Sequence, residues 1–148
     1  MTGRGADGAS LILRVTTGLI FLFSGLQKLV PGTDATVAYF RDLGLPWPEL
    51  MGPAMGALEL FGGFALLVGF LTRMVGGLFV AEMLVALLVA RLAGATAVHS
   101  VADAITLVRV ELLLIASCSC LVLIGGGRWS VDAILRRRGG TASAQDPP

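Results

Sequence analysis

Five charged residues inside long apolar stretches of this sequence are candidates for a shared polar site: Lys28, Glu59, Glu82, Arg109 and Glu111. A charge at the centre of a bilayer costs about 2.5–3.5 kcal/mol on insertion scales, so such residues pair, face a bundle interior or reach water. An amine and carboxyl groups enclosed together can form ion pairs or bind a polar ligand. The pattern therefore predicts a polar pocket in the outer half of a membrane domain.

A second interpretation of these charges needs no ligand, because ion pairs could simply fix the register of neighbouring helices. Catalytic residues stay unknown, since the sequence has no phosphate loop, nucleophile elbow or paired histidines, and it predicts no metal site. The lone histidine, His99, is expected in a loop. Cys118 and Cys120 are two residues apart in an apolar run, so they would point in different directions on a helix and are expected to be small fillers.

The elements that must position these charges are membrane-spanning helices. Of the 148 residues, 55% are hydrophobic and 14% are charged, whereas soluble domains carry about 25% charged residues. A span needs about 17–25 apolar residues, and a single segment in lipid satisfies its backbone only as a helix. We predict an all-α bundle of four transmembrane helices, with spans at about residues 11–30, 50–71, 74–90 and 105–124.

The remaining segments complete a single domain. Residues 1–10 form an N-terminal tail, residues 11–124 the transmembrane domain, and residues 125–148 a basic tail that is disordered at its end. Ser100 and Ser130 are expected to cap the helices that follow them.

The loop between the first two spans predicts a short helix that lies on the membrane surface. Thr33 can cap its start and Gly44 can end it. Its apolar face would consist of Val37, Phe40 and Leu43.

The basic residues that flank the spans predict the orientation. With an even number of spans, Arg73, Arg128 and the run from Arg136 to Arg138 share one side. The positive-inside rule makes that side cytoplasmic and places both termini there. The net charge of +1 gives no overall field that would attract nucleic acid, so the lipid bilayer is the expected environment.

Glycine residues share helix faces with the charges. On the first span the stripe is Arg14, Gly18, Phe21, Gly25 and Lys28, and on the second it is Gly52, Gly56, Glu59 and Gly63. Small residues let membrane helices approach closely, so the first two spans are expected to pack through these faces. Glu59 would then lie near Lys28 or Arg109, while Arg14 is expected to be an anchor at the inner interface.

The sequence resembles the DoxX family of small four-helix bacterial membrane proteins. The resemblance is carried by Leu13-Arg14, Gly18, Phe21, Gly25 and Gln27-Lys28, by Glu59 to Gly63, Leu67, Gly69 and Thr72-Arg73, and by Glu111 and Gly125 to Asp132. It implies a location in the inner membrane. The family-pattern positions that it implies are Arg14, Gly18, Gly25, Lys28, Glu59, Gly63, Gly69, Arg73 and Asp132.

The resemblance also implies a class of function. The family is named for its similarity to subunits of thiosulfate:quinone oxidoreductase, and its members are linked to redox or oxidative-stress pathways. This implies an accessory or quinone-associated subunit that works with a redox partner protein. The chain has no C-x-x-C pair and no histidine within its predicted spans, so a bound quinone, a flavin or a partner would have to carry electrons. The alternatives are a membrane scaffold or assembly factor and a small transporter that uses the polar pocket.

Overall fold

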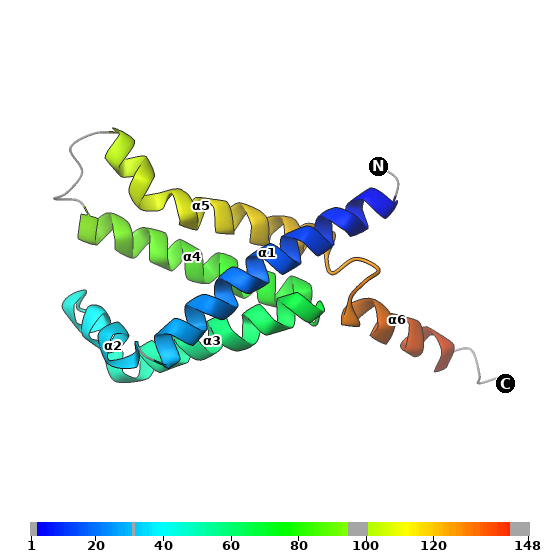
Figure 1. The fold of residues 1–148 in the computed structure, drawn as a ribbon, viewed down its shortest axis with the longest axis horizontal. Coiled ribbons are helices and arrows are strands. Elements are labelled where there is room, and N and C mark those ends of the chain that lie inside the picture. Colours follow the sequence, from blue (N-terminus) through cyan, green and yellow to red (C-terminus); the bar gives the residue numbers. More distant parts are fainter. Residues whose placement is uncertain (1–2, 31, 95–100, 143–148) are drawn as a thin grey trace.

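The computed structural model describes residues 3–30, 32–94 and 101–142, and within these ranges the chain is all-helical. This confirms the predicted all-α class, while the count of four transmembrane helices stays a prediction. His99 and Ser100 lie outside the described ranges, as do residues 143–148 of the tail. The helices are α1 (Gly3–Leu29), α2 (Thr33–Asp42), α3 (Pro48–Val68), α4 (Thr72–Gly94), α5 (Val101–Ile124) and α6 (Val131–Ala142) (Figure 1).

Three of these helices are long and apolar enough to cross a bilayer. The qualifying segments are Gly5–Leu29, Pro48–Val68 and Thr72–Val89. Large apolar side chains on their outer faces, such as Ile12, Phe61 and Leu78, are exposed, as expected for surfaces that contact lipid. The 24 residues of α5 make it about 36 Å long at ~1.5 Å per residue, and its role as a fourth span stays a prediction.

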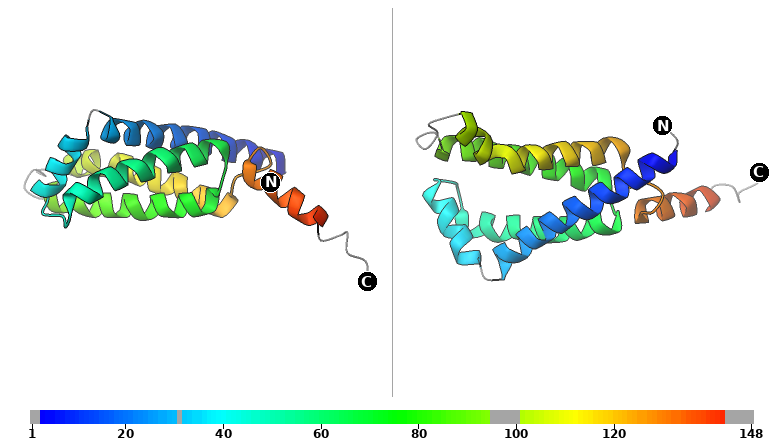
Figure 2. Two further views of the ribbon diagram at one scale, coloured as in Figure 1. Left: turned by 90° about the horizontal axis from the view of Figure 1, so that it is seen from below. Right: turned by 45° about the horizontal axis from the view of Figure 1, so that its top comes forward.

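The long helices form two antiparallel pairs (Figures 1 and 2). α1 packs along most of α3, and α4 packs along α5, whereas contacts between the pairs are fewer. A core joins the pairs near their middle, where the rings of Phe21 and Phe79 stack with centroids 3.6 Å apart. Leu66, Cys118 and Leu121 are completely buried in the same core, so Cys118 is an apolar filler as expected.

Glycines set the close approach of α1 and α3. A β-carbon on Gly18 would lie 2.9 Å from the Gly63 carbonyl oxygen, and one on Gly25 would lie 2.6 Å from the Gly56 carbonyl oxygen. The predicted packing through two glycine stripes is confirmed for these four residues. Gly52 differs, because the nearest atom to a β-carbon there is Cγ2 of Val37 on α2, at 3.1 Å.

The helix in the first loop is present as α2. Gly44, with φ of +68°, follows it and ends it as predicted. The Thr33 hydroxyl, however, donates to the Lys28 and Leu29 carbonyl oxygens at 3.1 and 2.9 Å, so it satisfies the end of α1 instead of capping α2. The prediction about Thr33 was wrong because a hydroxyl can serve either helix end.

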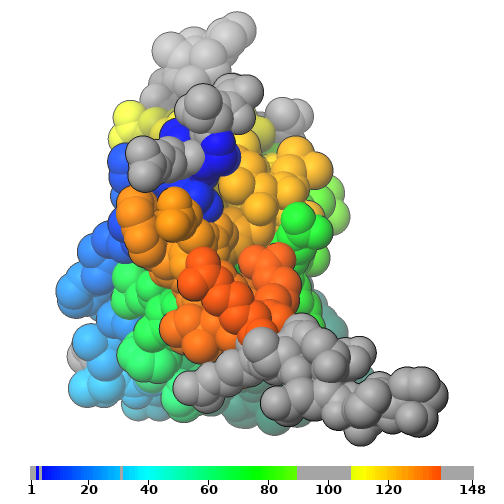
Figure 3. All heavy atoms as spheres, turned by 90° about the vertical axis from the view of Figure 1, so that its right-hand side faces the viewer, coloured from blue at the N-terminus to red at the C-terminus, as the bar shows by residue number. Residues whose placement is uncertain are grey.

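The segment between α5 and α6 closes one end of the bundle. In Figure 3 it lies between the first turns of α1 and the turn that joins α3 to α4. The Asp132 carboxylate accepts hydrogen bonds from the backbone N–H groups of Leu71 and Thr72 at 2.8 and 2.9 Å. These are free donors at the start of α4, so Asp132 caps a helix that begins sixty residues earlier.

Arg14 lies at this same end and is buried. Only 1% of it is exposed, and its Nη2 donates to the Trp129 carbonyl oxygen at 2.8 Å. The expectation that Arg14 is an anchor at the inner interface is corrected. Its side chain binds the segment between α5 and α6, which we call the closing segment. Ser10 makes a similar link, because its hydroxyl donates to the Gly125 carbonyl oxygen at 2.6 Å.

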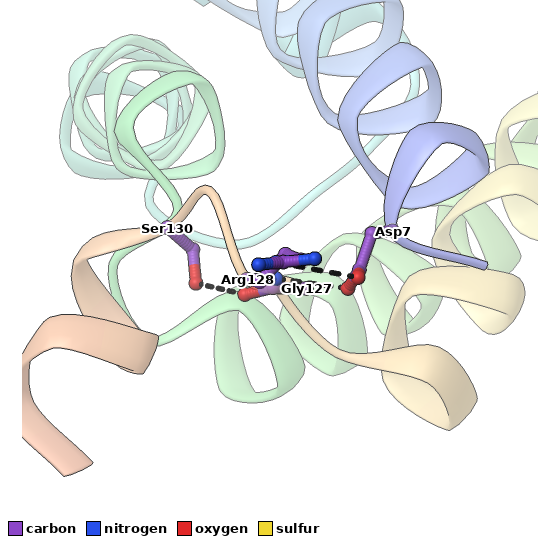
Figure 4. A network of polar contacts seen from close by, with 4 residues as sticks. All are labelled: Asp7, Gly127, Arg128 and Ser130. Atoms are coloured by element: carbon purple, nitrogen blue, oxygen red, sulfur yellow. Dashed lines mark hydrogen bonds and ion pairs between the residues drawn. The ribbon is translucent and has the colours of Figure 1, made fainter. Parts of the chain in front are cut away.

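Asp7 and Ser130 fix the two edges of the closing segment (Figure 4). The Asp7 carboxylate accepts from the Arg128 N–H at 2.9 Å and lies 3.9 Å from the Arg128 guanidinium. The Ser130 hydroxyl donates to the Gly127 carbonyl oxygen at 2.7 Å and accepts from the Ala133 N–H at 3.2 Å. Ser130 therefore caps α6, as predicted.

Replacing Asp132 by Ala should lower the unfolding free energy by about 2 kcal/mol, the upper range for loss of a helix cap. The reason is that two N–H groups of the α3–α4 turn would lose their acceptor. Thermal unfolding in detergent measures the effect, with Asp42→Ala, an exposed position at the end of α2, as the matched control. An equal effect of the two substitutions would contradict the cap.

Candidate functional site

A cavity of about 240 Å³ lies between the two helix pairs, bordered by α2. Four charged residues line it: Lys28 on α1, Glu59 on α3, Glu82 on α4 and Glu111 on α5. The remaining wall is mainly apolar and includes Phe40, Leu43, Met51, Met55, Met83 and Val85. The cavity therefore combines a small charged cluster with a hydrophobic wall, which is the usual composition of a small-molecule site.

Lys28 and Glu59 form an ion pair in this cavity. The Lys28 Nζ donates to Glu59 Oε1, and only 2% of Glu59 is exposed. The two helices are close beside this pair, since a β-carbon on Gly56 would lie 2.9 Å from the Leu29 Cγ and 3.2 Å from the Lys28 Cβ. The absence of a side chain at Gly56 thus permits the close approach of α1 and α3 where Lys28 reaches Glu59.

Three carboxyl oxygens around the cavity have no hydrogen-bond partner in the part of the chain that the structure describes. They are the Oε2 atoms of Glu59, Glu82 and Glu111. Only 6% of Glu82 is exposed. Buried polar groups are nearly always hydrogen-bonded, so three unpaired oxygens in one cavity indicate room for a proton, a water or a ligand.

The predicted pocket residues divide into two groups. Lys28, Glu59, Glu82 and Glu111 line the same cavity. The Arg109 side chain is exposed and is not among the lining residues. The depth of Arg109 in the membrane predicts that it lines the pocket. In the structure, the orientation of α5 about its own axis turns the Arg109 side chain away from the cavity.

The family-pattern positions lie in three different parts of the structure. Lys28 and Glu59 belong to the cavity, while Gly18, Gly25 and Gly63 form the α1–α3 contact. Four others lie at the closed end of the bundle: Arg14, Gly69, Arg73 and Asp132. There the Gly69 carbonyl oxygen accepts from the Asp132 N–H at 3.0 Å, and the exposed Arg73 places its Nη2 3.3 Å from the Leu123 carbonyl oxygen.

Sequence reasoning missed the cavity wall supplied by α2 and the start of α3. Thr36, Tyr39 and Phe40 of α2 and Met51 and Met55 of α3 line the cavity. One signal was available, because Phe40 and Leu43 lie on the apolar face of the predicted surface helix. In the structure these two side chains line the cavity, so part of that face points into the protein.

The charge balance limits what this site can do. Three carboxyl groups and one ammonium group leave two negative charges if all are ionised. Uncompensated charge is expensive inside a membrane, so protons or a cation must neutralise the surplus. Across residues 3–30, 32–94 and 101–142, no three His, Cys, Asp or Glu side chains are placed to hold a metal ion.

Comparison with known proteins finds several proteins with similar sequences. The chain is 39% identical over 83 residues to the Bacillus subtilis protein named "Putative oxidoreductase CatD", covering 56% of this chain and 60% of CatD. It is 26% identical over 140 residues to the "Uncharacterized membrane protein Rv3486" of Mycobacterium tuberculosis, covering 91% and 86% of the two chains. No solved structure matches.

A third relative is named as an inner membrane protein. The chain is 36% identical over 70 residues to the "Inner membrane protein YphA" of Escherichia coli, covering 47% of this chain and 49% of YphA. The chain thus spans about 60% of the length of CatD and about half of that of YphA. The family model described as DoxX matches residues 9–92, which is more than half of the chain, so this protein belongs to the DoxX family of membrane proteins.

Proposed function

We propose that this protein is a quinone-associated accessory subunit of a redox system in the bacterial inner membrane, with both termini in the cytoplasm. The observation that carries the proposal is the cavity in which a half-buried lysine and three glutamates meet an apolar wall. The name of CatD, which describes an oxidoreductase, supports the redox class, and the name of YphA supports the membrane. The basic residues at the closed end of the bundle support the orientation.

The residues of the cavity fit a quinone head group. Its two carbonyl oxygens accept hydrogen bonds, and the Lys28 ammonium can donate one of them. Glu82 and Glu111 can donate others when protonated on Oε2, the atoms that have no hydrogen-bond partner among the described residues. A volume of about 240 Å³ is below the ~300–1,000 Å³ of sites for drug-sized molecules, so it suits one substituted ring and leaves a lipid tail outside.

The chain's own residues would orient and protonate rather than transfer electrons. A bound quinone supplies two-electron, two-proton chemistry, and the carboxyl groups of Glu82 and Glu111 line the cavity where protons would be passed to it. Lys28, fixed by Glu59, would orient one carbonyl oxygen, and the apolar wall would exclude water. None of the described lining residues carries electrons, and in this proposal a partner subunit supplies them.

The test is the quinone content of the protein purified from its native membrane in mild detergent. Extraction and mass spectrometry should find quinone in a near-stoichiometric amount, and Leu43→Trp, which fills the cavity from the loop after α2, should lose it. Glu49→Gln is the control, because Glu49 is exposed and pairs with Arg41. Thermal unfolding establishes that each variant is folded.

Two results would overturn the proposal. One is quinone at the level found for an unrelated membrane protein purified in the same way. The other is a stable partner protein with no quinone in native mass spectrometry, which would instead support a scaffold or assembly factor.

A further inference from the structure

We propose that the same cavity binds protonated aryl-alkyl amines, which enter as cations in exchange for protons held by its carboxyl groups. This ligand class goes beyond the quinone role and does not depend on it. A neutral ligand would leave the charge of the carboxyl groups unchanged. A cationic ligand would compensate one of their negative charges, in exchange for a proton where a carboxyl group holds one.

The buried carboxyl groups are the first argument. Glu59 and Glu82 are 2% and 6% exposed, and each keeps an unpartnered Oε2 at the cavity. Glu111 contributes a third such oxygen from α5. Lys28, the one amine among the described lining residues, is already bonded to Glu59 Oε1, so these three oxygens have no donor within the part of the chain that the structure describes.

A primary ammonium group would supply the missing hydrogen-bond donors. It carries one positive charge and three N–H donors with no acceptor, and there are three unpartnered oxygens. Hydrogen bonds between ionised partners are about twice as strong as neutral ones. An alcohol of the same shape offers one donor and no charge, so it would leave two of the three oxygens without a donor.

The wall of the cavity favours an ammonium group that is attached to an aromatic ring. Tyr39 and Phe40 present aromatic rings, and Met51, Met55 and Met83 present flexible thioether side chains. Methionine packs favourably against aromatic rings, and aromatic faces attract cations. The volume of about 240 Å³ accommodates one aromatic ring on a short chain.

The groups that face Glu82 indicate that amine binding is coupled to the release of a proton. Lys28, Glu59, Glu111 and the Tyr39 hydroxyl share its cavity, and the buried Cys118 lies beside it on α5. Among these groups only the glutamates carry surplus negative charge. Binding of one cation should therefore release about one proton, and affinity should rise with pH by up to about tenfold per pH unit, because a released proton is a product of binding.

The experiment is calorimetry on the full-length protein in detergent with 2-phenylethylamine, in two buffers of different ionisation enthalpy. We expect release of about one proton for each amine bound. We also expect binding at least about tenfold tighter than that of 2-phenylethanol, the neutral analogue, and no binding of the anion 3-phenylpropanoate. Glu82→Gln should weaken amine binding by about tenfold or more, because it removes a charge-assisted contact, whereas Glu49→Gln should leave it unchanged.

Thermal unfolding checks that Glu82→Gln is folded, and Glu111→Gln, at a partly exposed site, replaces it if it is not. Equal affinity for the amine and the alcohol, absence of proton release, or normal amine binding by both folded glutamate variants would overturn the inference. Amine binding without any co-purified quinone would leave the inference standing and sink only the quinone proposal. Quinone binding without amine binding would do the reverse.

Discussion

Replacing Lys28 by Met should lower the unfolding free energy by about 3 kcal/mol, because it leaves the buried Glu59 without its partner. Breaking a buried ion pair typically costs about 3–5 kcal/mol, and the lower value applies because the Lys28 side chain is 30% exposed. Glu59→Gln alone should also destabilise the bundle. The double variant should recover part of the loss, which gives a coupling energy above about 1 kcal/mol in a double-mutant cycle.

The chain offers a matched control for this cycle. Arg41 and Glu49 form an ion pair at 2.7 Å with side chains 62% and 67% exposed, and exposed pairs couple by about 0.2–1 kcal/mol. Arg41→Met and Glu49→Gln should therefore be nearly additive. If the Lys28–Glu59 pair couples no more strongly than this surface pair, burial does not strengthen it. If Glu59→Gln keeps its stability but alters ligand binding, Glu59 is a ligand-binding acid rather than a structural one.

Replacing Gly25 by Val should disrupt the bundle more than the same replacement at any other glycine of α1. A β-carbon at Gly25 would lie 2.6 Å from the Gly56 carbonyl oxygen and 2.9 Å from the Leu60 Cα, and neither backbone atom can rotate away. Overpacking a core typically costs about 1–3 kcal/mol and occasionally more. We expect at least the upper value, because the two helices must separate along their whole contact.

The control for Gly25→Val is Gly77→Val on α4. Gly77 is also a helical glycine, but no atom lies within 4 Å of its β-carbon position, so the two variants share the same change in helix propensity. Thermal unfolding in detergent should separate them clearly. Similar losses would show that propensity, and not helix contact, determines the effect.

The sequence predicts the α1–α3 contact because its signal is local. Gly18, Gly25, Gly56 and Gly63 recur at helical spacing, so the faces that meet can be recognised from each helix alone. The same spacing places Lys28 on the stripe of Gly25 and places Glu59 on that of Gly56 and Gly63. Two glycine faces in contact then bring the two charges together.

The closed end of the bundle could not be predicted in this way. Asp132 caps α4 and Trp129 accepts from Arg14, but these contacts join segments far apart in sequence and depend on how the whole chain folds back. Arg109 shows a different limit. Its depth in α5 resembles that of Glu111, and only the packing of α5 on α4 decides which of the two faces the cavity.

The contacts of the closing segment also impose an order on biosynthesis. Ser10 bonds a residue 115 positions later, and Asp7 bonds one 121 positions later, so the first turns of α1 obtain these partners only after α5 has been made. A ribosome builds the N-terminal part first, and α1 and α3 can pair while the rest is still emerging. A chain truncated after α5 would keep its long helices but expose the amides at the start of α4. The bundle therefore gains its last stabilising contacts only when the chain beyond α5 has been made.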